Sequence, residues 1–336
     1  MKELISALLA AVQRGERAVL CTVLASSGSA PRGAGARMAV FRNGNTLGTV
    51  GGGAVELRVR QEALETLKSG KAVCRAYSLA PEDVRSVGMI CGGAVTVCCQ
   101  VLTKADEALL KSLLKALEGR ENTWLLLCLG ADGSVETGLY GAQSGLIFGK
   151  EDLLTVVQPH LTARSWYEAG ERTLYAEPFS RAGRVWIFGG GHVGRALVPV
   201  LASVGFRVSV FDDRPELAVP ERYEKAEQVV CGDFADLASA AQLMPDDLAV
   251  VMTPGHLADQ TVLLQLLRQE PPAYVGCIGS RGKAERTRAF LRENGVPEER
   301  IAAVHTPIGL AIGAQTPEEI AVSIAAELIA FRAGRA

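Results

Sequence analysis

The second half of the chain alternates short, continuously apolar runs with longer segments in which apolar residues recur every three or four positions. The first pattern is typical of buried strands, and the second is typical of helices that bury one face. We expect strands at 184–188, 207–211, 228–231, 248–252 and 273–278, and helices at 192–203, 234–242, 258–269 and 281–294. Regular alternation of this kind predicts a Rossmann-like, doubly wound parallel sheet with helices on both faces.

A last helix is predicted from its first residues as well as from its period. Thr316 precedes Pro317, which suits the first helical position, and Glu319 stands three residues after Thr316. This is the spacing of a capping box. The buried face of this helix is supplied by Ile320, Ile324, Leu328 and Phe331.

The first half has a less regular pattern. Helical spacing is found at 2–14, 54–68 and 104–118, and strand-like segments at 18–25, 37–41, 46–50, 73–79, 94–102, 123–129 and 134–140. This mixture predicts a mixed α/β domain. The polar stretch from Gln158 to Gly183 is interrupted by proline and glycine, which is typical of a domain boundary. We therefore place an N-terminal α/β domain at 1–180 and the Rossmann-like domain at 181–336.

Composition narrows the classes of partner. The chain has 336 residues, 48% of them hydrophobic and 21% charged, with a formal net charge of −2. Without a basic run or an apolar stretch of about 18 residues, we expect neither nucleic acid nor a membrane as a partner. The amphipathic start lacks the features of a signal peptide, so we expect a cytoplasmic protein. The eight cysteines form no C-x-x-C pair or cysteine/histidine cluster, so we expect no metal site.

Three glycines follow the first strand of the second half, in the segment VWIFGGGHVGRAL. Gly189, Gly191 and Gly194 form G-x-G-x-x-G between a strand and a helix, where free amides and the helix dipole favour a pyrophosphate. Asp212 and Asp213 close the next strand, where a carboxylate accepts hydrogen bonds from a ribose and repels a 2′-phosphate. The pattern predicts a site for NAD or another ribose ligand. The alternative is that the glycines only permit close packing of helix on strand.

Further polar residues end the neighbouring strands, and a doubly wound sheet gathers such residues in one crevice. Gly255 and His256 follow the fourth strand, and Ser280 and Arg281 follow the fifth. His256 is a candidate general acid or base, or a phosphate ligand, and a purely structural histidine is the alternative. His192 lies within the glycine turn, where the helix dipole favours a neutral, hydrogen-bonding imidazole.

Several longer segments are more specific than the glycine pattern. They are VLASSGSAPRGAGARMAVFRNGNTLGTVGGGAVE, MICGGAVTV, VWIFGGGHVGRAL, FDDRPE, TPGH, GCIGSRGK and HTPIGLAIGAQTPEEIAVSIAAE. Together they resemble the XdhC/CoxI family of accessory proteins for molybdenum hydroxylases. The resemblance implies a protein that binds the molybdenum cofactor, supports its sulfuration with a cysteine desulfurase, and delivers it to a xanthine dehydrogenase-like apo-enzyme.

The resemblance also implies binding residues in the first domain. These candidates are Ser29, Arg32, Arg37, Gly51, Gly52 and Gly53. One glycine-rich turn in each domain would hold the anionic parts of molybdopterin, with the arginines supplying positive charge. The alternative for the loop that precedes Arg37 is a structural Ω-loop.

One cysteine is a candidate catalytic residue. Cys91 precedes two glycines, a setting that suits transient ligation of sulfur or molybdenum, and a small buried residue is the alternative. The chain also departs from the family pattern. Ala54 stands where some members carry cysteine, and TPGH and GSRGK stand where TRGH and GSRRK are expected, which removes two positive charges from the crevice.

These observations favour a cofactor chaperone over a hydride-transfer enzyme. The chain lacks the C-x4-C-x2-C run of a plant-type iron–sulfur cluster, so it is not the hydroxylase itself. The alternatives are an NAD-dependent oxidoreductase that uses His256, and a nucleotide-sensing binding module. We expect the molybdenum cofactor as ligand, with NAD or another nucleotide as the alternative. The expected partners are the apo-enzyme, the desulfurase and a second copy of the chain as a homodimer.

Overall fold

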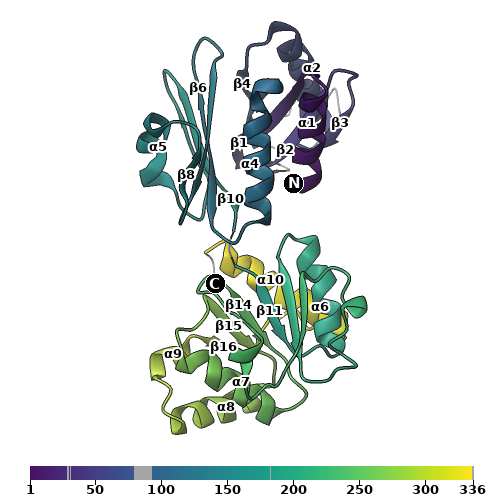
Figure 1. Ribbon diagram of the computed structural model, residues 1–336, viewed down its shortest axis with the longest axis vertical. Coiled ribbons are helices and arrows are strands. Elements are labelled where there is room, and N and C mark those ends of the chain that lie inside the picture. The colour runs from purple at the N-terminus through teal and green to yellow at the C-terminus, as the bar shows by residue number, and fades with distance from the viewer. Residues whose placement is uncertain (29, 31, 79–92, 182, 335–336) are drawn as a thin grey trace. The chain divides into compact units, whose positions relative to one another are not determined.

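The computed structural model describes residues 1–28, 30, 32–78, 93–181 and 183–334. The chain folds into two compact units, Met1–Arg181 and Ala182–Ala336. Each unit buries apolar cores of its own, and Figure 1 shows the elements of both.

The first unit contains two antiparallel five-stranded sheets, in the orders β3-β2-β1-β5-β4 and β8-β7-β6-β10-β9. The strands of the first sheet are β1 (Ala18–Gly28), β2 (Arg37–Phe41), β3 (Thr46–Gly48), β4 (Val73–Ser78) and β5 (Gly93–Leu102). Those of the second sheet are β6 (Thr123–Leu129), β7 (Val135–Gly141), β8 (Gly145–Phe148), β9 (Trp166–Ala169) and β10 (Thr173–Ser180). The α-helices are α1 (Lys2–Gln13), α2 (Gly53–Ser69), α4 (Glu107–Glu118) and α5 (Glu151–Val157). The prediction of a mixed α/β domain is confirmed.

Strand β1 is the middle strand of the first sheet, and its side chains alternate between two apolar layers. Val19, Cys21 and Val23 pack in the layer that includes α2. Ala18 and Leu20 pack in the layer that includes α1 and α4. At roughly 1.5–3 kcal/mol for each fully buried large aliphatic side chain, both layers stabilise the position of β1 and of the loop that follows it.

The second unit is built on one parallel six-stranded sheet in the order β13-β12-β11-β14-β15-β16. Its strands are β11 (Val185–Phe188), β12 (Val208–Asp212), β13 (Gln228–Cys231), β14 (Leu248–Val251), β15 (Tyr274–Cys277) and β16 (Val304–His305). Its α-helices are α6 (His192–Ser203), α7 (His256–Arg268), α8 (Arg281–Glu293), α9 (Glu298–Ala302) and α10 (Pro317–Arg332). The prediction of a Rossmann-like parallel sheet is confirmed.

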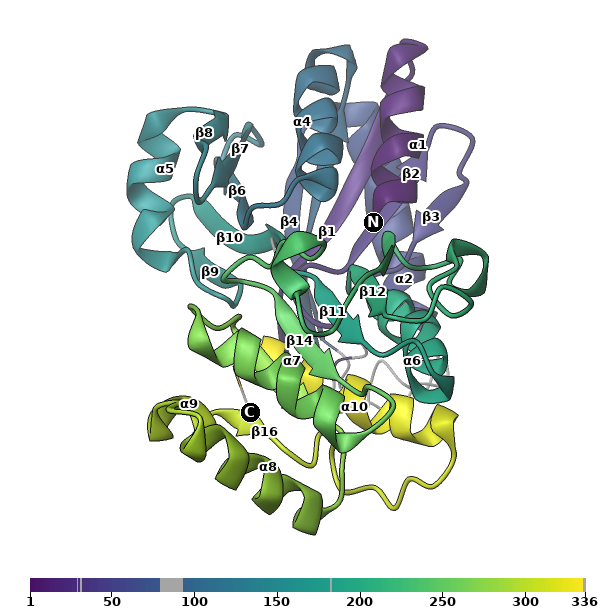
Figure 2. The same ribbon diagram turned by 60° about the horizontal axis from the view of Figure 1, so that its bottom comes forward.

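Helices cover both faces of this sheet. Leu197 of α6 and Ile324 of α10 belong to the core on one face, and Leu263 of α7 and Leu291 of α8 belong to the core on the other. Figure 2 shows α7 and α10 on opposite sides of the sheet. Every residue of β11 and β14 is buried, which explains why these strands are continuously apolar rather than alternating.

The predicted start of the last helix is confirmed. The Thr316 hydroxyl accepts a hydrogen bond from the amide of Glu319 at 3.2 Å, and the Glu319 carboxylate accepts one from the amide of Thr316 at 3.0 Å. These two bonds form the capping box of α10.

The predicted helix at 234–242 is wrong. This segment contains only the 3-10 turn η4 (Leu237–Ser239). The side chain of Gln265 in α7 accepts a hydrogen bond from the amide of Leu237 at 2.9 Å and donates one to the carbonyl of Phe234 at 2.6 Å. A side chain from another element thus satisfies main-chain groups that a helix would pair internally.

Candidate functional site

Three helices of the second unit begin at one edge of its sheet. Strands β11, β14 and β15 are neighbours, and α6, α7 and α8 follow them along the chain. The first residues of these helices are His192, His256 and Arg281, and all three are exposed. Helix N-termini present unpaired amides and the positive end of the helix dipole, so this edge favours an anion. The structure thus brings these three predicted residues to one edge of the sheet.

The residues that precede α7 and α8 complete this edge. Gly255 is the N-cap of α7, and Ser280 is the N-cap of α8. The Ser280 hydroxyl accepts a hydrogen bond from the amide of Lys283 at 3.3 Å. One first-turn amide of α8 is therefore already satisfied by the protein, whereas no side chain caps α7.

The glycine turn before α6 is tightly packed on one side and open on the other. Gly189 has a φ of +118°, and a Cβ added there would lie 2.2 Å from the carbonyl oxygen of Met252. A Cβ at Gly194 would lie 2.2 Å from the carbonyl oxygen of Gly189. By contrast, a Cβ at Gly191 would meet nothing within 4 Å. Packing therefore requires the first and third glycines, and the second leaves space before the helix N-terminus.

Asp212 holds the glycine turn through one carboxylate oxygen, and both of its oxygens bond to Arg214. The residue is 0% exposed, and Oδ2 accepts a hydrogen bond from the amide of Gly190 at 2.6 Å. The Arg214 guanidinium donates to Oδ1 at 2.8 Å and to Oδ2 at 2.9 Å, and the Arg214 amide donates to Oδ1 at 3.0 Å. Burial opposes ionisation, but the hydrogen bonds from Arg214 and Gly190 outweigh it and lower the pKa of Asp212.

Asp213 faces the solvent at the same strand end. Its side chain is 44% exposed, and Oδ1 lies 3.7 Å from Nε of Arg214. Partial burial and the neighbouring charge of Asp212 raise its pKa. Of the two predicted acids, Asp213 is therefore the one free to accept hydrogen bonds from a ribose.

Replacing Asp212 by asparagine is expected to lower the free energy of unfolding by about 2 kcal/mol at neutral pH, because a neutral amide binds the Arg214 guanidinium more weakly. The pKa of Asp212 is lowered in the fold, so this stabilisation is present above the ordinary value of 3.8 and is lost as the pH falls below it. Urea unfolding of both proteins at about pH 7 and about pH 3 checks the sign, because the gap between them should shrink at low pH. A gap that stays constant would contradict a role for the carboxylate charge.

A buried carboxylate that the sequence does not reveal positions the loop before α7. Asp259 is 0% exposed and accepts hydrogen bonds from the amide and the hydroxyl of Thr253 at 2.9 and 2.6 Å. It also forms an ion pair with Lys283 of α8. One side chain therefore links the end of β14 to two of the three helix N-termini. The only sign in the sequence is an acid in the first turn of a helix, which is common.

The glycine turn of the first unit is occupied by a carboxylate of its own helix. Gly51, Gly52 and Gly53 lead into α2, which begins at Gly53. Oε2 of Glu56 accepts hydrogen bonds from the amide of Gly52 at 3.1 Å and from the hydroxyl of Thr49 at 2.5 Å. Because this negative group already lies at the helix N-terminus, the turn is less suited to an anion than the edge in the second unit.

A pocket of about 300 Å³ lies next to this turn, a volume at the small end of ligand sites. Arg32, Arg37 and Thr49 are among the residues that line it. Arg32 is exposed, whereas Arg37 is 6% exposed and forms an ion pair with Glu177. Arg32 is therefore the arginine of this pocket that is accessible to an anion.

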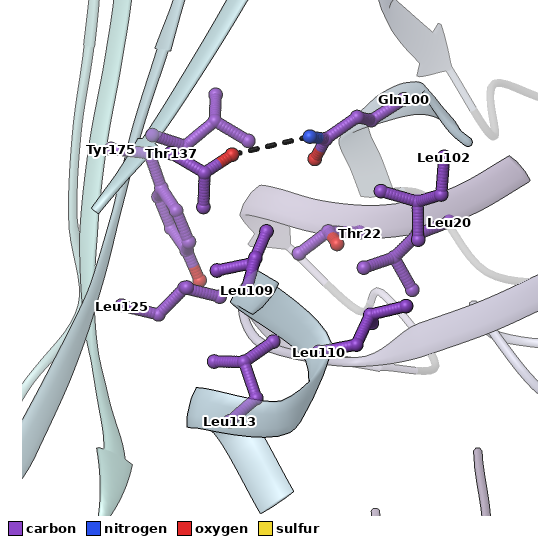
Figure 3. Close-up of a pocket in the computed structure, with 11 residues that line it drawn as sticks. Leu20, Thr22, Gln100, Leu102, Leu109, Leu110, Leu113, Leu125, Thr137 and Tyr175 are labelled. Carbon is purple, nitrogen blue, oxygen red and sulfur yellow. Dashed lines mark hydrogen bonds between the residues drawn. The ribbon is translucent and has the colours of Figure 1, made fainter. Parts of the chain in front are cut away.

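A smaller cavity lies inside the first unit, and Figure 3 shows its lining. At about 20 Å³ it is large enough for one water molecule and too small for a cofactor. Leucine side chains form most of its wall, and Gln100 donates a hydrogen bond to the hydroxyl of Thr137 at 3.1 Å. We therefore do not assign this cavity as the ligand site.

Two of the predicted residues, Ser29 and Cys91, lie outside the described residues. Of the cysteines that the structure describes, Cys231 is the exposed one, at the end of β13 and opposite Asp212 in the strand pairing. No group of three histidine, cysteine, aspartate or glutamate residues in the described part of the chain is arranged to hold a metal ion. Over the same residues, no helix combines the length and the apolar character needed to span a bilayer.

Family models match both units. Residues 185–328 match the model described as the XdhC Rossmann domain, and residues 11–78 match the model of the XdhC and CoxI family. Two named relatives extend this similarity. One, from Bacillus subtilis (strain 168), is named as a probable xanthine dehydrogenase subunit and is 29% identical, over 94% of this chain and 94% of its own length. The Escherichia coli (strain K12) molybdenum cofactor insertion chaperone PaoD is 26% identical, over 96% of this chain and 86% of its own length.

The fold of both units also recurs in a solved structure. A crystal structure described as a xanthine dehydrogenase from Bacillus halodurans covers 100% of this chain and 96% of its own, with a TM-score of 0.79 and 27% sequence identity. The similarity therefore extends over both units and is not limited to the Rossmann-like sheet.

Proposed function

Because the chain belongs to the XdhC and CoxI family, we propose that it binds the molybdenum cofactor and delivers it to a xanthine dehydrogenase-like apo-enzyme. Family membership and the named relatives support an accessory role for molybdenum enzymes. Cofactor binding and delivery are the finer parts of the proposal. Sulfuration with a cysteine desulfurase, the role of Cys91 and a homodimer remain predictions from the resemblance.

The observation that carries the proposal is the meeting of three helix N-termini at one edge of the second sheet. Molybdopterin carries a phosphate, and its nucleotide forms carry more than one. Main-chain amides at the starts of α6, α7 and α8, with the exposed side chains of His192, His256 and Arg281, fit such a group. Asp213 beside them fits a hydroxyl of an attached ribose.

The first unit adds a second binding element. The exposed Arg32 next to a pocket of about 300 Å³ suits an anionic group of a ligand bound to this unit. The bound cofactor supplies the molybdenum chemistry that the client enzyme uses. The residues of this chain bind its anionic groups and hold it until transfer.

The proposal is tested by purifying the full chain from cells with and without molybdopterin synthesis and measuring pterin fluorescence and molybdenum. We expect both only where the cofactor is made. Pterin retained by a His256→Ala/Arg281→Ala variant should fall about tenfold or more relative to the wild type, because a hydrogen bond to a charged group contributes roughly 1.5–3 kcal/mol. Arg286→Ala is the matched control, since Arg286 is exposed on α8 beyond its first turn. Equal retention by the double variant, or no pterin in the wild type, would contradict the proposal.

The solvent-facing carboxylate of Asp213 also favours a second candidate function, an NAD-dependent oxidoreductase. The same preparations separate the two functions. Steady NADH oxidation by protein without pterin would favour the oxidoreductase. Tight nucleotide binding with neither pterin nor turnover would favour a nucleotide-sensing module.

A further inference from the structure

Arg37 and Glu177 form a buried ion pair between the two sheets of the first unit. Arg37 begins β2 in one sheet, and Glu177 lies in β10 of the other. Their side chains are 3% and 6% exposed, and the ring of Phe179 lies 5.7 Å from the guanidinium carbon of Arg37. Burial lowers the pKa of Arg37 to about 10, so the guanidinium is still charged at neutral pH.

Stability alone explains this pair poorly. Taking two charges out of water costs several kcal/mol for each ion, and apolar residues of similar volume often stabilise a fold as well or better. The Arg37 Nε atom is also buried without a hydrogen-bond partner in the described structure. A buried group that is only partly satisfied requires an explanation, and here the explanation lies in what Arg37 contacts.

Three segments line the pocket of about 300 Å³, and Arg37 bonds to two of them, the Arg32 loop and the residues before the glycine turn. Its Nη1 donates a hydrogen bond to the carbonyl of Gly35 at 3.1 Å, at the end of the loop that carries Arg32. Its own carbonyl accepts a hydrogen bond from the amide of Thr49 at 2.9 Å, just before the glycine turn. One residue therefore joins two of the three segments that form the pocket.

Glu177 fixes the same loop from the other sheet. Gly35 has a φ of +87°, and a Cβ added there would lie 2.5 Å from Oε2 of Glu177. The positive φ favours glycine here, and an added Cβ would displace the Glu177 carboxylate from the loop. The ion pair and the loop are thus packed as one unit.

We propose that the Arg37–Glu177 ion pair positions the first unit's binding pocket by setting the spacing between the Arg32 loop and the turn after Thr49. Arg32 makes the contact to the ligand, and Arg37 acts through the loop that it holds. This inference rests on the proposed function, because the ligand is an anionic part of the molybdenum cofactor.

The test separates positioning from stability. An Arg37→Met/Glu177→Leu variant replaces the pair with apolar side chains, so its free energy of unfolding should stay within about 1 kcal/mol of the wild type or rise. Pterin retention by the full chain, measured by fluorescence after co-expression, should nevertheless fall about tenfold, to the level of Arg32→Ala. Adding Arg32→Ala to the double variant should cause no further loss, because both changes remove the same contact.

The matched control is Arg75→Met/Glu62→Leu, which removes the ion pair between Arg75 Nε and Glu62 Oε2 at 3.1 Å in the same unit. This control should retain wild-type pterin. If the apolar pair at 37 and 177 does not fold, Arg37→Lys takes its place. It keeps the charge and loses the forked geometry, and it should also lose pterin without a matching loss of stability.

Two results would overturn the inference. One is wild-type pterin retention by the folded double variant while Arg32→Ala loses it. The other is additive losses in the triple variant. If the wild type retains no pterin, the proposed function fails separately, and inorganic pyrophosphate becomes the probe in calorimetric titrations of the wild type, Arg32→Ala and the double variant. Pyrophosphate binding that Arg32→Ala weakens and the double variant does not, or binding that Arg32→Ala leaves unchanged, would then overturn the inference.

Discussion

A Gly189→Ala variant is expected to lose more than about 4 kcal/mol of unfolding free energy. The φ of +118° at this position strains any residue with a Cβ, and the new atom would lie 2.2 Å from the carbonyl oxygen of Met252. That oxygen belongs to the main chain at the end of β14, so it cannot rotate away. Either β11 and β14 move apart or the turn unwinds, and both changes disrupt the core of the second unit.

Gly191→Ala is the control in the same turn. A Cβ there meets nothing within 4 Å, so we expect a loss of less than about 1 kcal/mol. Hydrogen exchange at Val185–Phe188, read by mass spectrometry beside circular dichroism, measures both variants. Native protection of β11 in Gly189→Ala would contradict the geometry described for the turn.

An Asp259→Ala variant is expected to lose about 3 kcal/mol, because it leaves the Lys283 charge and the Thr253 amide without their buried acceptor. Lys283 is 21% exposed and can turn towards water, which places the loss at the lower end for a broken buried pair. Asp259→Asn should lose less, since its amide oxygen still accepts from Thr253. Chemical unfolding of the three proteins gives this order.

The same variant should also weaken cofactor retention, because Asp259 links the starts of α7 and α8. Asp233→Ala is the control. Asp233 is an exposed acid that follows β13, and its carboxylate accepts a local hydrogen bond from the amide of Ala235 at 2.7 Å. We expect it to lose less than about 1 kcal/mol. A comparable loss of unfolding free energy and of cofactor retention in both variants would show that burial of Asp259 is not the cause.

Much of the second unit is predictable from sequence because the four inner strands of its sheet, β12, β11, β14 and β15, are buried throughout. A continuously apolar run such as Val185–Phe188 indicates a strand, and the helix that follows it is recognised from its hydrophobic period alone. Strand β16 is not predicted from the sequence because its two residues, Val304 and His305, are too few to show a hydrophobic period. The segment 234–242 departs from its predicted helix because of Gln265, whose bonds to that segment no local pattern reveals.

The candidate site is less predictable because it depends on which way polar side chains point. Asp212 and Asp213 read as equivalent acids in sequence, but neighbouring residues at a strand end point to opposite sides. Only the fold shows that Asp212 turns inward to Gly190 and Arg214.

The same limit applies to the first unit. Glu177 reads as a solvent-exposed residue of a polar stretch. It is buried against Arg37, and because Arg37 lies 140 positions earlier in the chain, no local pattern reveals the pair.

The donors at the starts of α6, α7 and α8 have a consequence for how such proteins diverge. A main-chain amide is present in every residue except proline, so most substitutions in these first turns leave the same donors in place. Under the proposed function, selection on phosphate recognition would act mainly on the path of the chain, through Gly189 and Gly194, rather than on the identity of the surrounding side chains. Side chains at this edge could then change, and suit different client enzymes, while the main-chain donors for the ligand stay the same.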